Sequence, residues 1–150
     1  MINAGACQSY FLAGLALARA RGTAAAPSAS AASVFVEYGT WLGAGSRCVA
    51  AGLREGGAAP GRFHAHDTFT LEPKGEPKKL RGTKWAGVIK GGDSYLPVWE
   101  GYVKGLYPSA VAHKGYINDA QGAPAGWGRR PVAVMATDCG KTLPHFKRQL

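Results

Sequence analysis

The stretch that decides the fold is residues 31–53, AASVFVEYGTWLGAGSRCVAAGL. If it is drawn as a helix, its large side chains fall on one face, namely Phe35, Tyr38, Leu42, Val49 and Leu53. The charged residues Glu37 and Arg47 fall on the opposite face. This period of 3.6 residues predicts an amphipathic helix over residues 31–56. The alternative is a strand over residues 33–41, where β-branched and aromatic residues are dense.

A helix over residues 31–53 is long enough to cross a bilayer, since it spans roughly 34 Å at about 1.5 Å per residue. Glu37 and Arg47 would each cost about 2.5–3.5 kcal/mol inside the membrane, so a solitary span is unfavourable. Gly39 and Gly43 have the G-x-x-x-G spacing that lets a second helix approach closely. We therefore expect either a transmembrane helix packed within a membrane assembly or an amphipathic helix packed on a soluble core.

Residues 1–30 form the first of three predicted parts of the chain. Residues 4–18 are apolar but too short to span a membrane, and the arginines and Ser/Ala-rich linker that follow contain no acid. This composition is typical of a mitochondrial import sequence that has been retained. The helix over residues 31–56 is the second part, and residues 57–150 form a small region with a basic tail.

The region from residue 57 onward is predicted to contain short strands and irregular segments. Residues 63–71 alternate as a strand does. The segments KWAGVIKG (84–91) and VWEGYVKG (98–105) both fit W-x-G-x-[IV]-K-G, which predicts a β-hairpin with Trp85 opposite Trp99. The prolines beyond residue 106 predict an extended, irregular tail with one short strand at residues 131–135. The predicted fold class is therefore α+β and loop-rich, with the helix over residues 31–56 as a candidate transmembrane helix.

The net charge of +9 favours an anionic partner, such as nucleic acid, an anionic lipid surface or an acidic protein. The excess lies in the C-terminal half, because thirteen of the 18 basic residues follow residue 70.

The cysteines are Cys7, Cys48 and Cys139. They are odd in number and widely spaced, which indicates neither a disulfide framework nor a zinc site and fits a reducing compartment.

Two short motifs suggest binding sites. His64 and His66 would lie on one face of a strand and could bind a metal if Asp67, His113 or Cys139 completed the site. Gly43, Gly45 and Cys48 nearly make the G-x-G-x-x-G nucleotide fingerprint, with Asp67 at a suitable distance, but the third glycine is missing and no βαβ alternation is evident. Gly140, Lys141 and Thr142 resemble the end of a phosphate-binding loop, but that motif needs a glycine where Met135 stands.

These patterns contain no nucleophile elbow and no paired carboxylates, so we assign no catalytic, cofactor-binding or metal-binding residue and expect no cofactor. We predict a non-catalytic accessory subunit that stabilises a large mitochondrial inner-membrane respiratory-chain complex. Its partners would be other protein subunits and membrane lipid. The alternative is a ribosomal protein of the mitochondrial matrix that binds rRNA through Lys74, Lys78, Lys79, Arg81, Lys84, Lys90, Arg129 and Arg130, beside Trp85 and Trp127.

Overall fold

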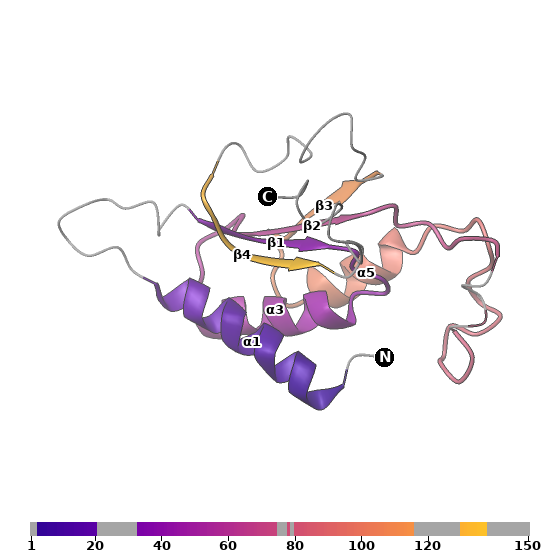
Figure 1. Ribbon diagram of the computed structural model, residues 1–150, viewed down its shortest axis with the longest axis horizontal. Helices are drawn as coiled ribbons and strands as arrows, with labels where there is room; N and C mark the ends of the chain where they lie inside the picture. The colour runs from indigo at the N-terminus through magenta and orange to yellow at the C-terminus, as the bar shows by residue number, and fades with distance from the viewer. Residues whose placement is uncertain (1–2, 21–32, 75–77, 79, 116–129, 138–150) are drawn as a thin grey trace.

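The computed structural model describes residues 3–20, 33–74, 78, 80–115 and 130–137, which have an α/β fold (Figure 1). The helices are α1 (Ala4–Arg19), α3 (Ala44–Glu55) and α5 (Leu96–Val103). The strands are β1 (Val34–Tyr38), β2 (Phe63–Asp67), β3 (Val111–Lys114) and β4 (Val132–Thr137). Helices alternate with strands along the chain, so the predicted α+β fold was wrong.

The four strands form one parallel sheet in the order β3-β2-β1-β4. Parallel neighbours need a crossover connection. Helix α3 lies in the connection from β1 to β2, and α5 lies in the connection from β2 to β3. Strand β4 then pairs with the other edge of β1. The direction in which strands are added therefore reverses between β1 and β4.

Strand β1 is buried on both faces, which explains why its sequence, VFVEY, does not alternate between apolar and polar residues. Phe35 belongs to the core shared with the helices, which lie together along one side of the sheet (Figure 1). Val34, Val36 and Tyr38 face the other side, where Met135 of β4 packs against them. Phe35 and Tyr38 therefore point to opposite faces of a strand instead of sharing one face of a helix.

The single helix predicted over residues 31–56 was wrong, because this stretch contains β1, a loop and α3. Gly39 and Gly43 have φ angles of 78° and 84°, values at which a residue with a Cβ is strained, and they turn the chain between the two elements. The alternative strand over residues 33–41 is confirmed at Val34–Tyr38. Among the described residues, no helix is long and apolar enough to cross a membrane.

Helix α1 packs against α3 through small residues, although Gly39 and Gly43 take no part in this contact. A Cβ on Gly52 would lie 2.1 Å from the carbonyl oxygen of Phe11, and one on Gly14 would lie 2.5 Å from that of Val49. The two helices are also joined by a disulfide between Cys7 and Cys48, whose Cα atoms are 5.5 Å apart. The expectation that the cysteines form no disulfide was wrong, because Cys7 and Cys48 are 41 positions apart in sequence and the packing of α1 on α3 brings them together.

The hairpin predicted over residues 84–105 was also wrong. Residues 80–89 form turns, and the second copy of the motif lies in α5, which has a proline in its first turn. Trp99 is fully buried on α5 while Trp85 is partly exposed, so the two rings do not pair across strands. The predicted strand at residues 63–71 is confirmed only for Phe63–Asp67, and the one at residues 131–135 corresponds to β4.

Candidate functional site

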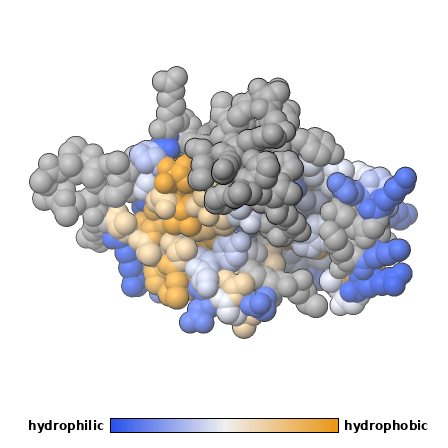
Figure 2. All heavy atoms as spheres, viewed as in Figure 1, coloured by the Kyte–Doolittle hydropathy of each residue, from blue (hydrophilic) through white to orange (hydrophobic). Residues whose placement is uncertain are grey.

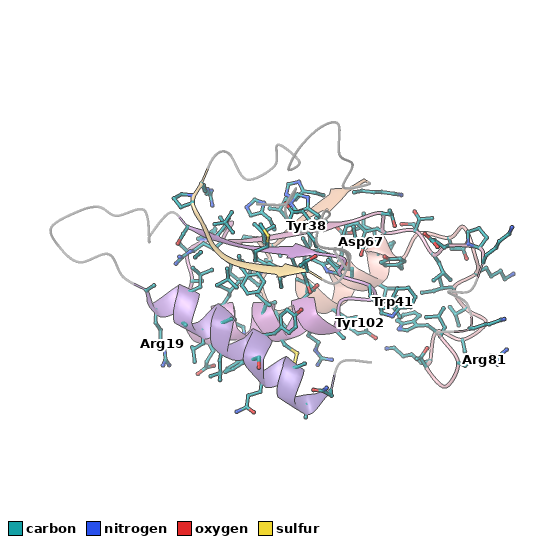
Figure 3. The ribbon with its side chains drawn as sticks, in the orientation of Figure 1. Arg19, Tyr38, Trp41, Asp67, Arg81 and Tyr102 are labelled. Carbon is teal, nitrogen blue, oxygen red and sulfur yellow. A yellow bond between two sulfur atoms is a disulfide. The ribbon has the colours of Figure 1, made fainter. Side chains whose placement is uncertain are left out.

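The loop after β1 is held by the carboxylate of Asp67, the last residue of β2. Its Oδ2 accepts hydrogen bonds from the backbone amides of Thr40 (2.7 Å) and Trp41 (3.1 Å). Its Oδ1 accepts from the amide of Phe69 (3.1 Å) and the hydroxyl of Tyr95 (2.7 Å). One side chain thus fixes the loop after β1, the loop after β2 and the start of α5 relative to one another. Figure 3 shows Asp67 and Trp41 at the same end of the sheet.

Both loops contain a residue in the left-handed region of backbone conformation. Trp41 has φ 51° and Phe69 has φ 50°. Such angles are uncommon for bulky residues and cost of order 1–3 kcal/mol, so the surrounding structure must hold them in place. Asp67 does so, since it accepts a hydrogen bond from the amide of each. Backbone strain of this kind concentrates at functional sites.

A buried polar network lies beneath the start of α3. Glu37, which is only 4% exposed, accepts a short hydrogen bond from the hydroxyl of Ser46. The same hydroxyl accepts from the indole N–H of Trp99 at 2.8 Å. A Cβ on Gly45 would lie 2.9 Å from a carboxyl oxygen of Glu37, so a larger residue there would have to displace the carboxyl group. The carboxyl group of Glu37 therefore lies against the first turn of α3.

Three histidines gather on β2 and β3. Nδ1 of His64 is 2.9 Å from Nε2 of His113, and the rings of His66 and His113 stack with centroids 4.2 Å apart. Desolvation by burial, followed by repulsion from the neighbouring histidines, lowers the pKa of His66 to about 3. Burial likewise lowers the pKa of His64 and of His113. The cluster therefore favours neutral rings.

The metal site that His64 and His66 suggested, to which no residue was assigned, is brought together only in part. His113 does join His64 and His66, whereas Asp67 is engaged with the two loops and Cys139 lies outside the described residues. Within the described ranges, no group of three or more histidine, cysteine or acidic side chains has a geometry that could hold a metal ion.

The incomplete G-x-G-x-x-G fingerprint lies in a βαβ unit, which was not evident in the sequence. Gly43 and Gly45 lie where the loop after β1 enters α3, and Asp67 ends the next strand, so a βαβ unit is present. Cys48, which replaces the third glycine, is buried and disulfide-bonded. Sequence reasoning missed the roles of Thr40, Trp41 and Tyr95. The triplet Gly140, Lys141 and Thr142 lies outside the described residues.

No protein-family model, curated protein or solved structure matches this chain. The fold and the site therefore define its class. The chain is an α/β protein with one parallel sheet in the order β3-β2-β1-β4. A glycine-containing loop at the carboxyl end of β1 is braced there by the acidic residue that ends β2.

Proposed function

We propose that this chain binds an adenosine-type cofactor at the carboxyl ends of β1 and β2. The observation that carries the proposal is the reversal of strand order between β1 and β4. In open parallel sheets, ligands bind outside the carboxyl ends of the strands at such a switch point. The order β3-β2-β1-β4 is also that of the first four strands of dinucleotide-binding folds. The likeness to dinucleotide-binding folds is one of strand order alone.

The local geometry supports the same position. The loop after β1 leads directly into the amino end of α3, where the first amides of a helix lack partners within the helix. Gly43, which precedes α3, makes no side-chain capping bond there. Asp67 fixes the loop from the end of β2 through its bonds to Thr40, Trp41, Phe69 and Tyr95. Trp41 is partly exposed and could supply an aromatic surface for a base.

The same geometry argues against a dinucleotide. In dinucleotide-binding folds, the pyrophosphate lies on the amino end of the first helix, and the third glycine lets the helix approach the sheet. Here the carboxyl group of Glu37 already lies against the first turn of α3, hydrogen-bonded to Ser46. A carboxylate and a phosphate are both acceptors and repel each other, so this position disfavours a phosphate. Cys48 takes the place of the third glycine.

A cofactor that combines adenosine with a cationic, phosphate-free group fits better. S-adenosylmethionine has this chemistry, since a sulfonium and an amino group take the place of the phosphates. We therefore propose that the chain binds S-adenosylmethionine and takes part in a transfer reaction that uses it. The carboxyl group of Glu37 would contribute a favourable field to the cationic part of the cofactor.

The test is calorimetric titration of the full chain with S-adenosylmethionine, S-adenosylhomocysteine, NAD⁺ and ATP. We expect saturable binding of the first two, with one site per chain, and we expect neither phosphorylated ligand to displace them from that site. Trp41→Ala should weaken binding about tenfold if its ring contacts the base. Trp85→Ala is the matched control, because Trp85 is also partly exposed but lies in a different segment. Displacement of bound S-adenosylmethionine by NAD⁺ or ATP at a similar concentration would contradict the proposal.

The roles predicted from sequence remain predictions. A non-catalytic subunit of a mitochondrial inner-membrane complex would copurify with its partner chains, and a ribosomal protein would bind rRNA in a salt-dependent manner. Of the residues proposed for rRNA binding, Lys79 and Arg129 lie outside the described residues. Mass spectrometry of the proteins that copurify with the native chain distinguishes these roles from a cofactor-dependent one.

A further inference from the structure

A second cluster of side chains, separate from the strand ends, combines positive charge with aromatic rings. It consists of Arg47 on α3, Lys84 and Trp85 in the turns before α5, and Tyr102 on α5, and we refer to these four residues as the Tyr102 patch. Arg47 and Lys84 are exposed, and the two rings are partly exposed. Three segments that are distant in sequence therefore converge on one tyrosine.

The cations of the Tyr102 patch are held in place by the aromatic rings. Nζ of Lys84 lies 4.9 Å from the ring centroid of Trp85 and 5.1 Å from that of Tyr102. The guanidinium carbon of Arg47 lies 5.9 Å from the centroid of Tyr102. The rings of Trp85 and Tyr102 meet edge to face. Cation–π contacts of this kind reduce the freedom of long side chains without neutralising their charge.

Positive charge at the patch is not balanced by acids within the described part of the chain. There, the ion pair found is between Lys104 and Glu100, which are four residues apart on the surface, and neither Arg47 nor Lys84 is joined to a carboxylate. The pKa of Tyr102 is lowered, first by its hydrogen bond with Lys84 and also by the charges of Lys84 and Arg47. The lowered pKa of the Tyr102 phenol is consistent with the positive charges of Lys84 and Arg47 beside it.

We propose that the Tyr102 patch binds a single phosphate group carried by a small molecule. Arg47 can offer a planar pair of N–H donors, Lys84 a compact charge, and Tyr102 a hydroxyl donor, and a phosphate accepts from several donors at once. This site is independent of the cofactor site. Glu37 disfavours phosphate on the buried side of the first turn of α3, whereas the exposed side chain of Arg47, at the end of that turn, favours it on the outer surface.

The geometry favours one phosphate over a nucleic-acid strand. Strand binding needs a track of cations along many phosphates and aromatic faces that are open to stacking bases. In the Tyr102 patch the cations converge on one point, and Lys84 lies against both rings. Other cations of residues 71–90 give this end of the molecule a hydrophilic surface (Figure 2), but Arg81 lies well apart from Tyr102 (Figure 3).

The experiment titrates the full chain with inorganic phosphate and follows the ³¹P linewidth, with acetate and a single-stranded oligonucleotide as separate arms. We expect saturable phosphate binding that the variant Arg47→Gln/Lys84→Gln weakens about tenfold or more. The matched control is Arg81→Gln/Lys90→Gln, which removes the same charge from exposed positions outside the patch. It should change affinity less than about twofold.

Three results would overturn the proposal. The first is an equal loss of affinity in the control variant, which would indicate a diffuse field. The second is equal competition by acetate, which would indicate an unspecific anion site. The third is oligonucleotide binding that strengthens with length and outcompetes phosphate. Tyr102→Phe provides a second test, because it keeps the ring and both cations while removing the hydroxyl, and it should weaken phosphate binding without changing thermal stability.

Discussion

The carboxylate of Asp67 and the backbone amide of Trp41 are joined by a 3.1 Å hydrogen bond that connects the ends of β2 and β1. The residues are 26 positions apart in sequence. This bond holds Trp41 at a φ angle of 51°, and the same side chain holds Phe69 at 50°. The shape of the candidate cofactor site therefore depends on one acidic residue outside the loop that it shapes.

Asp67→Asn should lower the free energy of unfolding by about 1–3 kcal/mol, because an amide NH₂ group would face backbone donors that now reach carboxylate oxygens. Chemical denaturation of both proteins measures the difference. The control is Asp93→Asn, since Asp93 accepts from the amide of Lys90 in an exposed turn. Its effect should stay within about 0.5 kcal/mol. Equal effects of the two changes would show that Asp67 does not brace the loops.

Gly52→Ala should be strongly destabilising, because its Cβ would lie 2.1 Å from the carbonyl oxygen of Phe11 and would force α1 away from α3. We expect a loss of about 2 kcal/mol or more in thermal or chemical unfolding. Gly101→Ala is the matched control. It lies on α5, and its Cβ would meet nothing within 4 Å. Helix propensity should make that change neutral or stabilising by up to about 1 kcal/mol. A tolerated Gly52→Ala would mean that α1 is not packed closely on α3.

The disulfide between Cys7 and Cys48 should contribute about 2–4 kcal/mol, because it closes a loop in the unfolded chain. Under oxidising conditions, Cys7→Ser should be less stable than the wild-type chain by this amount. In excess dithiol, which reduces the disulfide, the two proteins should have similar stability. Alkylation of the denatured, unreduced protein should label one thiol, that of Cys139. Labelling of all three cysteines in freshly purified protein would contradict the pairing.

The histidine cluster should make the folded protein less stable as the pH is lowered. The pKa of His66 is about 3 in the folded protein, against 6.5 as the ordinary value. Between these values the unfolded chain binds more protons than the folded one, so folding is penalised as pH falls below about 6.5. His66 alone should contribute about 1.4 kcal/mol per pH unit in this window. Unfolding measured at several pH values should show a shallower slope for His66→Gln. An unchanged slope would mean that His66 is not held neutral.

The local patterns of the sequence predicted some elements but not how they join. The alternation of residues 63–71 predicted a strand, which is confirmed for Phe63–Asp67, and the short strand predicted at residues 131–135 corresponds to β4. The single helix predicted over residues 31–56 was wrong because a strand, a loop and a helix together place large side chains at helical spacing. The two glycines with positive φ, Gly39 and Gly43, mark that break, yet the same spacing resembles a motif of packed helices.

The candidate site was predictable only in outline. The spacing of Gly43, Gly45 and Asp67 in the sequence resembles a nucleotide-binding fingerprint. Without the βαβ order, that spacing did not predict a site. The bonds from Asp67 to Thr40 and Trp41 depend on sheet register, which pairs Tyr38 with His66 and which no local pattern specifies. The meeting of Cys7 with Cys48 likewise depends on the packing of α1 on α3.

The most direct test of the proposed cofactor site is to map binding of S-adenosylmethionine residue by residue, by ¹⁵N–¹H NMR of the full chain. We expect the amide shifts that change with saturation to concentrate at residues 37–47 and 67–70, at the carboxyl ends of β1 and β2. Absence of saturable shifts, or shifts confined to the opposite ends of the strands, would contradict the proposal that this edge of the sheet is the cofactor site.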